Sequence, residues 1–252
     1  MRKSICSGIG LLMLTAGLVG PLTPVAAGDP TPESVLARSD VSRGGGLPGI
    51  RWEARLIAVE NDSERVQELV VEARDRDSLV TFQAPARVRD QRLLMRGRNL
   101  WFVRPDVRRP VPISPRQRLV GDAATGDVAS TNYAADYEAR EMRVAPCGEE
   151  TCYVLDLHAA SGDVTYAQIR YWVSQTREVG VKAEFFTVSG RHFRTAEFEY
   201  DNRVQYDGEE MPFVSRMVIR DEVGTGETIL EYSNVEAVDI PVRRFDPQYL
   251  VR

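Results

Sequence analysis

Few side chains in this sequence have the types and spacing needed for chemistry. His158 and His192 are the two histidines, and neither belongs to a two-histidine metal motif or to a Gly-x-Ser-x-Gly elbow. His158 lies near Asp156 and Ser161, the one Ser/His/Asp grouping along the chain. Because serine and aspartate are common at strand ends, hairpin polarity explains this grouping better than a catalytic triad does. The sequence therefore predicts no catalytic residue, cofactor or metal site.

Residues 1–27 have the pattern of a secretory signal peptide. Arg2 and Lys3 provide a short positive start, residues 9–19 form an apolar run, and small residues at 25–27 precede Gly28. The alternative is a retained membrane anchor, but the run is shorter than the about 20 residues that a spanning helix needs. We therefore expect export, followed by a single folded domain over residues 28–252.

Two cysteines, Cys147 and Cys152, remain once residues 1–27 are removed. An exported chain enters an oxidising compartment, and the spacing allows a small closed loop across a turn. A shared metal ion is the alternative, but two thiols without a nearby histidine or third cysteine do not complete a tetrahedral zinc site. We expect a disulfide at a hairpin tip, with no catalytic role.

Charge and composition exclude several classes of protein. The 252 residues contain 32 basic and 37 acidic side chains, so the net charge of −5 does not suit a protein that wraps nucleic acid. Hydrophobic residues make up 43% of the chain and charged residues 27%, which excludes a disordered chain and a multi-spanning membrane protein.

Alternation of apolar and polar residues dominates the chain from residue 50 onward. This pattern predicts strands over 50–58, 65–74, 78–87, 90–96, 99–104, 138–145, 152–158, 166–174, 181–188, 192–200, 211–220 and 227–236. Short turn-like links favour antiparallel neighbours, and no long helical pattern intervenes. The predicted fold class is mainly β with few helices, built on one large curved antiparallel sheet.

Two segments depart from the strand pattern. Thr31 can cap and Pro32 can open a short helix over residues 33–38, which the glycines at 44–46 would stop. Residues 104–136 contain four prolines together with Gly121 and Gly126, which predicts a long excursion with at most a short helix. Long excursions in compact domains are often functional lids.

Aromatic side chains carry the clearest functional signal. Trp52, Trp101 and Phe185 lie within predicted strands, and the adjacent aromatic pairs at 171–172 and 185–186 must point to opposite sides of a sheet. Both faces should therefore bear large apolar surface. Two interpretations stay open: a two-sided core, or a concave face that is incompletely filled and binds an apolar ligand.

Several segments resemble one known family. Residues 100–105, LWFVRP, look like the "LWFYNP"-type strand of the LolA family of periplasmic lipoprotein carriers. Residues 108–115 and 121–133 are similar to the broader outer membrane lipoprotein-sorting protein family, and residues 166–173 and 182–190 resemble its paired C-terminal strands. The resemblance covers most of residues 32–250.

The resemblance implies a LolA/LolB-like unclosed β-barrel with a helical and loop cover and a cavity for acyl chains. It implies a non-enzymatic periplasmic carrier that transfers a lipoprotein or lipid toward the outer membrane. An inner-membrane transporter and an outer-membrane acceptor would be its partners. The alternative is a non-catalytic periplasmic adaptor of an RND-type membrane transporter. In LolA a basic residue before the LWF strand helps to hold and release the acyl chains, and Arg87, Arg89 and Arg92 are the candidates here.

Site residues follow from this interpretation. Trp101, with Trp52 and Phe185 on neighbouring strands, is expected to bind acyl chains. Residues 106–135 are expected to form a mobile cover in which Leu119 and Val120 rest on the groove. The prolines of this segment lack the backbone donors that a central strand would need, so the segment should lie outside the sheet.

Overall fold

The computed structural model describes residues 29–60, 63–107, 109–129, 132–222, 224 and 226–251. The predicted signal peptide, residues 1–27, lies outside the described residues. Within the ranges described, no helix combines the length and the apolar character needed to cross a membrane.

The first described element is helix α1 (Pro32–Val41), which confirms the predicted helix and extends it at both ends. The Ser34 N–H donates to Thr31 Oγ1 (3.2 Å), and Pro32 occupies the first turn, where an N–H would have no helical partner. The helix buries Val35 and Leu36. It ends before Gly44, whose φ of +92° is a backbone conformation that favours glycine.

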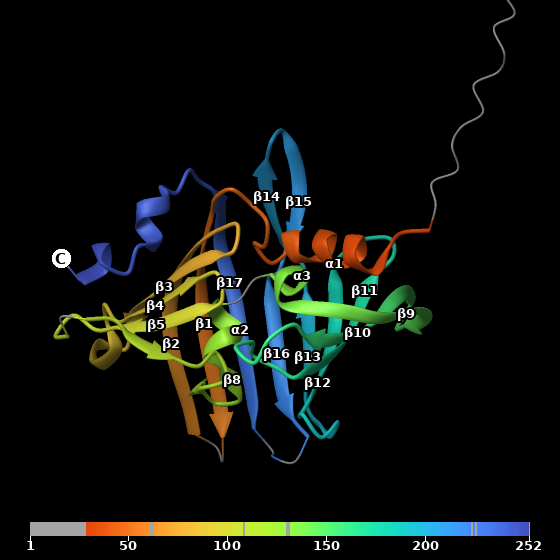
Figure 1. The fold of residues 1–252 in the computed structure, drawn as a ribbon, viewed down its shortest axis with the longest axis horizontal. Coiled ribbons are helices and arrows are strands. Elements are labelled where there is room, and N and C mark those ends of the chain that lie inside the picture. Colours follow the sequence, from red (N-terminus) through yellow and green to blue (C-terminus); the bar gives the residue numbers. More distant parts are fainter. Residues whose placement is uncertain are drawn as a thin grey trace, which may run out of the picture.

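Thirteen of the described strands form one antiparallel sheet, and its two edges do not pair with each other. In spatial order the strands are β6 (Val111–Ile113), β5 (Asn99–Val103), β4 (Arg92–Arg96), β3 (Asp77–Ala84), β2 (Ser63–Arg74), β1 (Ile50–Glu60), β17 (Glu227–Ala237), β16 (Arg216–Asp221), β13 (His192–Glu199), β12 (Gly180–Phe186), β11 (Gln168–Ser174), β10 (Glu150–Ala159) and β9 (Tyr137–Cys147). The sheet curves around the helices without closing into a barrel (Figure 1). This arrangement confirms the predicted mainly β fold with an unclosed sheet.

The pairing of β1 with β17 joins the two halves of the sheet. Their register runs from Ile50 opposite Ala237 to Val59 opposite Glu227, with an irregularity near Arg51. The strands on either side are mostly connected in sequence order, as short hairpin links predict. Sequence alternation therefore predicts the local pairs, whereas the β1–β17 pair joins residues that are far apart in the chain.

One predicted strand is wrong, because residues 211–220 divide between two sheets. β15 (Glu209–Phe213) pairs with β14 (Asn202–Tyr206), and this hairpin projects beside α1 in Figure 1. The chain changes sheets at Val214 and Ser215. Their N–H groups donate to the carbonyl oxygens of Ser42 (2.9 Å) and Glu199 (2.8 Å), so neither continues the β14–β15 ladder. The predicted strand over 78–87 also stops early, before the turn η1 (Ala86–Val88).

The excursion over residues 104–136 contains more regular structure than predicted. β6 adds an edge strand to the sheet, β7 (Arg118–Val120) pairs with β8 (Ala123–Ala124), and two short helices follow, α2 (Thr125–Ala129) and α3 (Tyr133–Asp136). Pro112 lies within β6, because an edge strand tolerates a residue without an N–H donor. The prediction that this segment stays outside the sheet is therefore wrong for β6.

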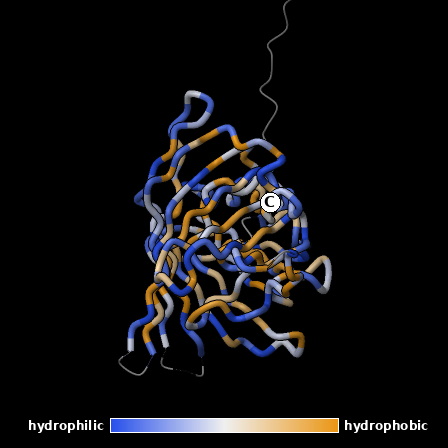
Figure 2. The backbone as a smooth tube through the Cα atoms, turned by 90° about the vertical axis from the view of Figure 1, so that its left-hand side faces the viewer, coloured by the Kyte–Doolittle hydropathy of each residue, from blue (hydrophilic) through white to orange (hydrophobic). Residues whose placement is uncertain are grey.

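The two faces of the sheet bury different side chains. On the concave face, residues from strands near both edges, such as Leu100 of β5 and Leu157 of β10, share one core with the helices. Polar and apolar residues alternate along the strands in Figure 2, as a sheet with two unlike faces requires. A second cluster lies on the convex face, where the C-terminal segment with turns η2 (Val242–Phe245) and η3 (Tyr249–Val251) packs. This cluster consists of Leu79, Leu94, Val103, Ile240, Phe245 and Leu250, with Trp101 against it.

The predicted disulfide is confirmed. Cys147 and Cys152 are bonded across the turn that joins β9 to β10, with a Cα–Cα distance of 5.9 Å. Gly148 in this turn has a φ of +68°, a conformation that glycine adopts without steric cost. The bond therefore fixes the tip of a hairpin at the edge of the sheet.

We predict that the thiols of Cys147 and Cys152 do not react with an alkylating reagent in the native, unreduced protein. Replacing both residues by serine should destabilise the protein by less than the about 3 kcal/mol expected for a 15-residue loop, because this loop is much shorter. Mass spectrometry after labelling and denaturant unfolding of both proteins measure the two effects. Labelling of two thiols in the unreduced protein would contradict the pairing.

Candidate functional site

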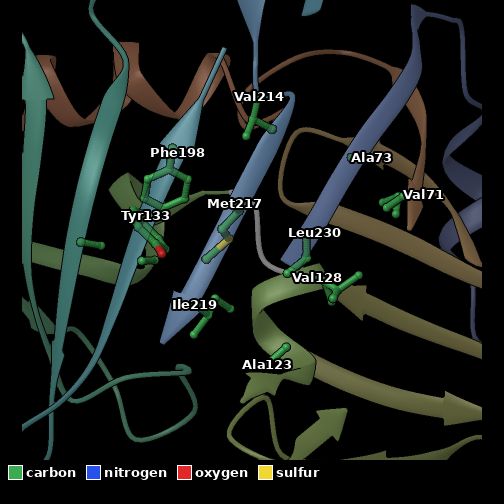
Figure 3. Close-up of a cluster of buried hydrophobic side chains, with 14 of the residues drawn as sticks. Val71, Ala73, Ala123, Val128, Tyr133, Phe198, Val214, Met217, Ile219 and Leu230 are labelled. Carbon is green, nitrogen blue, oxygen red and sulfur yellow. The ribbon is translucent and has the colours of Figure 1, made fainter. Parts of the chain in front are cut away.

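Three helical segments cover the concave face of the sheet. α1 precedes β1, whereas α2 and α3 come from the excursion between β6 and β9. Val35, Val128 and Tyr133, one from each helix, belong to the main core. The Ser78 hydroxyl of β3 donates to the Ala129 carbonyl of α2 (2.5 Å). In Figure 3 α2 lies over the sheet, with Val128 directed toward β17. The concave interior is thus closed by elements that are separate from the sheet.

Two glycines allow the excursion to approach its neighbours closely. A Cβ at Gly121 would lie 2.2 Å from Thr228 Oγ1 of β17, and a Cβ at Gly126 would lie 1.9 Å from Thr165 Oγ1. Neither distance is possible for a side chain. The Asp122 N–H also donates to Thr228 Oγ1 (2.7 Å). Glycine at 121 and 126 is therefore required for the observed packing of the cover against β17 and Thr165.

A buried arginine lies within the interior. Arg43 follows α1 and is 7% exposed, and its guanidinium carbon lies 4.2 Å from the ring centroid of Tyr133 and 5.4 Å from that of Phe198. A cation over an aromatic ring is stabilised by the ring quadrupole, by about 2 kcal/mol or more where water is excluded. One nitrogen, Nη1, is buried without a hydrogen-bond partner in the described part of the chain. Arg43 therefore links the turn after α1 to α3 and to β13.

Asp40 connects α1 to α3 by a hydrogen bond. Its Oδ2 accepts from the Ala134 N–H (2.7 Å), so the end of α1 is joined to the first turn of α3. Burial raises the pKa of Asp40 from 3.8 to about 7, although the Ala134 hydrogen bond and the charge of Arg43 act to lower it. The carboxyl that joins the two helices therefore titrates near neutral pH.

Asp127 makes the corresponding connection for α2. The Tyr166 hydroxyl donates to both carboxylate oxygens (2.8 and 2.9 Å), and the Ala124 N–H donates to Oδ2 (2.8 Å). Burial raises the pKa of Asp127, while the hydrogen bonds from Ala124 and Tyr166 lower it. The Tyr137 hydroxyl accepts from the Tyr166 N–H (3.1 Å). Tyr166 is therefore bonded both to α2, through Asp127, and to β9, through Tyr137. The cover is thus held by a few buried polar contacts as well as by apolar packing.

The three aromatic residues predicted to bind acyl chains do not share one surface. Trp52 is 2% exposed in the concave core, with its ring centroid 5.4 Å from that of Phe213. Phe185 is also in the concave core, stacked on Tyr166 at 3.8 Å. Trp101 lies on the convex face, against the C-terminal segment. A single groove lined by all three is therefore not formed, and lipid binding by each stays a prediction.

The cover residues lie where the sequence suggested contact with the interior. Val120 is buried in the main core, and Leu119 is half-buried against it. Arg116 and Arg118 of the same segment are exposed. Whether this segment moves stays a prediction.

One space between α2 and the sheet is nearly filled in this arrangement. The space lined by Arg43, Trp52, Val128 and Leu230, among others, measures ≈ 10 Å³, which holds about one water molecule. A larger cleft of ≈ 340 Å³ opens near the β12–β13 turn, and its lining includes Tyr166 and Phe193. At the space beside α2, an acyl chain therefore fits only if α2 moves away from the sheet.

Other residues singled out in the sequence lie outside the interior. His158 and Asp156 line a cleft of ≈ 420 Å³, but both Asp156 oxygens are bound by arginines, Arg143 (2.9 Å) and Arg170 (2.9 Å). Arg87 and Arg89 are exposed, and Arg92 donates to the Leu250 carbonyl (3.3 Å) of the C-terminal segment.

Sequence reasoning missed the buried polar residues Asp40, Arg43 and Asp127. An aspartate at a helix end and an arginine beside glycines are ordinary surface features, so the local sequence held no signal of burial. The contacts of Arg43 come from residues about 90 and 155 positions later in the chain.

We predict that Asp40 makes the protein less stable as the pH rises. Because the folded-state pKa is about 7 and the unfolded value is 3.8, the folded state binds more protons over this interval. The free energy of unfolding therefore falls with increasing pH between these values. From about pH 5 to about pH 8 the wild type should lose on the order of 2–3 kcal/mol relative to Asp40→Asn. Denaturant unfolding of both proteins across this range measures the difference.

Glu33→Gln is the matched control, because Glu33 is an exposed acid on the same helix. It should leave the pH dependence of the wild type unchanged. Parallel pH profiles for the wild type and Asp40→Asn would show that Asp40 is not the titrating group.

Comparisons with known proteins identify the family. A family model described only as an uncharacterized protein matches residues 74–252, and no curated protein matches the chain. A solved LolA superfamily protein from Nitrosomonas europaea is 31% identical, with a TM-score of 0.76 over 86% of this chain and 98% of the other. A putative outer membrane lipoprotein-sorting protein domain from Vibrio parahaemolyticus is 16% identical, with a TM-score of 0.74 over 87% of this chain and 98% of the other.

A DUF1329 family protein from Desulfovibrio piger has the same fold at 16% identity, with a TM-score of 0.70 over 86% of this chain and 97% of the other. The open antiparallel sheet and its helical cover are therefore common to several solved proteins. Because the Nitrosomonas protein is related over nearly its whole length and at this identity, the chain belongs to the LolA superfamily.

Proposed function

We propose that this protein is a non-enzymatic periplasmic carrier that binds the acyl chains of a lipoprotein or lipid in its concave interior. The observation that carries the proposal is an apolar interior closed by helices that are separate from the sheet. Family membership supports the same function. The proposal includes cleavage of residues 1–27 as a signal peptide and transfer toward the outer membrane. An inner-membrane transporter would load the protein, and an outer-membrane acceptor would unload it.

The energetics favour exchange between the cover and the cargo. Each buried CH2 contributes about 0.8 kcal/mol, so a chain of about 16 carbons gains roughly 12 kcal/mol on leaving water. Displacing the cover exposes buried side chains such as Val120, Val128 and Tyr133, each of which contributes about 1.5–3 kcal/mol. These opposing terms are of similar size, so the cargo can bind strongly and still be released.

The buried polar contacts of the cover also favour reversibility. Asp40 and Arg43 lie inside an apolar core, where ionised groups are costly. When the cover moves away from the sheet, water can reach both groups and reduce that cost. Opening therefore recovers solvation free energy that a purely apolar interior would not offer.

The three tryptophans of the chain provide reporters for the position of the cargo. Trp52 is in the concave core, Trp101 is under the C-terminal segment, and Trp172 lies half-buried beside Lys182 on β11–β12. In variants that keep one tryptophan and replace the other two by phenylalanine, a brominated fatty acid should quench the Trp52 protein much more strongly than the other two. Steady-state fluorescence titration of delipidated protein measures this.

Two controls answer separate questions: which face of the sheet binds the cargo, and whether the protein carries lipid at all. Quenching of the Trp101 protein alone would move the cargo to the convex face and support the placement suggested by the sequence. Native mass spectrometry of protein purified without detergent tests carriage directly, because a carrier should retain lipid. An adaptor of a membrane transporter should contain none, and that result would overturn the proposal.

We predict that the cover moves when cargo binds. Amide hydrogens in residues 109–129 and 132–136 should exchange faster in one state than in the other, because displacement from the sheet breaks their buried contacts. A cover that closes over cargo predicts slower exchange in the loaded protein, whereas a cover displaced by cargo predicts faster exchange. The nearly filled space beside α2 favours faster exchange in the loaded protein, because cargo at that position would have to displace the helix.

Strands β11 and β12 are the internal controls, since they form the wall of the interior and should keep their protection in both states. Equal exchange of the cover in loaded and delipidated protein would show that Leu119 and Val120 belong to a static loop.

A further inference from the structure

Basic residues are strongly concentrated in one part of this acidic chain. Residues 86–118 contain ten arginines against two aspartates, a formal charge of +8, whereas the whole chain carries −5. The rest of the chain therefore carries −13. A positive region on an otherwise negative protein separates charge across the molecule. A negatively charged surface therefore attracts the positive region and orients the protein.

The fold collects half of these arginines at one end of the sheet, which we call the basic end: Arg87, Arg89, Arg92, Arg104 and Arg109. The strand register explains the clustering, because Arg92 of β4 pairs with Val103 of β5, and Arg104 follows directly. Phe102 pairs with Val111 of β6, which places Arg109 beside the same strand ends. Arg87 and Arg89 lie in the η1 connection from β3 to β4, at the left of Figure 1.

Most cations of the basic end have no acidic partner. Arg104 pairs with Asp106 (2.7 Å), but within the described ranges no ion pair involves Arg87, Arg89 or Arg109. Many strand arginines elsewhere on the surface are neutralised by neighbours, as Arg220 is by Glu197 (2.7 Å) and Glu227 (2.8 Å), whereas exposed Arg96 of β4 and Arg140 of β9 have no ion pair in the described ranges but lie apart from each other in the sheet. The unpaired arginines therefore leave a positive surface available for an external anion.

Exposed apolar side chains lie among these arginines. Val111 of β6 is 46% exposed. Tyr249, which is 47% exposed, precedes Leu250, whose carbonyl accepts from Arg92 (3.3 Å). Peripheral attachment to a bilayer combines cations for the anionic head groups with apolar or aromatic residues for the interface. Binding of an acidic polypeptide would need only the cations. The exposed apolar side chains beside them therefore favour a bilayer as the partner.

We propose that the basic end docks the protein on the surface of an anionic lipid bilayer. This proposal goes beyond lipid carriage, because the docking surface is formed by strand ends and connections at one end of the sheet and not by the side chains of the main core. Docking would hold the carrier at a membrane while cargo is exchanged. It requires no movement of the helical cover, so the two proposals can be tested separately.

The first experiment measures flotation of delipidated protein with vesicles. The protein should bind vesicles of equal parts phosphatidylcholine and phosphatidylglycerol at low ionic strength, should be released by salt, and should not bind pure phosphatidylcholine. The double variant Arg87→Gln, Arg109→Gln should bind more weakly by up to about 25-fold, given roughly fivefold per cation near an anionic surface.

The matched control removes the same charge from the other half of the sheet. Arg140 of β9 and Arg191 of the β12–β13 turn are exposed, and the variant Arg140→Gln, Arg191→Gln should keep nearly wild-type binding. Equal losses in the two double variants would overturn the proposal, because binding would then follow net charge. Absence of vesicle binding, together with retention on immobilised polyglutamate, would also overturn it in favour of an acidic polypeptide partner.

The exposed valines of the two sheet edges test the apolar part of the interface. Val111 lies on β6, and Val144, which is 60% exposed, lies on β9 at the opposite edge. Val111→Ser should weaken vesicle binding by about fivefold, and Val144→Ser should not change it. Equal effects of the two substitutions would contradict insertion at the basic end. Lipid retention by native mass spectrometry should be unaffected in all four variants.

Discussion

The apolar concave face of the open sheet is the constraint on which the rest of this structure depends. A sheet of thirteen strands that curves without closing leaves an interior too wide for its own side chains to fill. Close packing requires other elements to occupy that space, because voids lose both dispersion contacts and hydrophobic stabilisation. Helices α1, α2 and α3 contribute side chains to the main core, and the space between α2 and the sheet is nearly filled.

The way the helices are held explains how such a cover can be both specific and reversible. Apolar packing alone would allow several positions of short helices on a smooth surface. Two directional hydrogen bonds define one position of the helices on the sheet. They join Asp40 to Ala134 and Asp127 to Tyr166. Their burial has a cost, visible in the raised pKa values of both carboxyls. The closed state is therefore well defined without being as stable as an entirely apolar core of the same size.

The convex face has a separate role, and its chemistry differs from that of the interior. Ion pairs cover much of it, and the C-terminal segment packs on its apolar part, where Phe245 is buried and Trp101 is half-buried. Toward the ends of β3, β4 and β5, three exposed cations, Arg87, Arg89 and Arg109, lie close together along the chain without an ion pair in the described ranges. Cargo binding inside and surface attachment outside can therefore be governed by different residues of the same sheet.

The sequence alone determined the features that depend on neighbours along the chain. Alternating residues identified most strands, Thr31 and Pro32 located α1, and the spacing of Cys147 and Cys152 identified the disulfide. Short links indicated antiparallel pairs, and the family resemblance indicated an open sheet with a cover. These features follow from side-chain periodicity, capping and chain length, which are local properties.

Only the tertiary structure decided which face of the sheet is the interior and which polar residues it contains. Alternation shows that Trp101 points away from Leu100 and Phe102, but the C-terminal segment makes its side the convex core. Arg43 becomes buried because α3 brings Tyr133 and strand β13 brings Phe198 to it. A residue's environment is set by contacts between distant segments, and periodicity within one strand cannot specify what packs against either face.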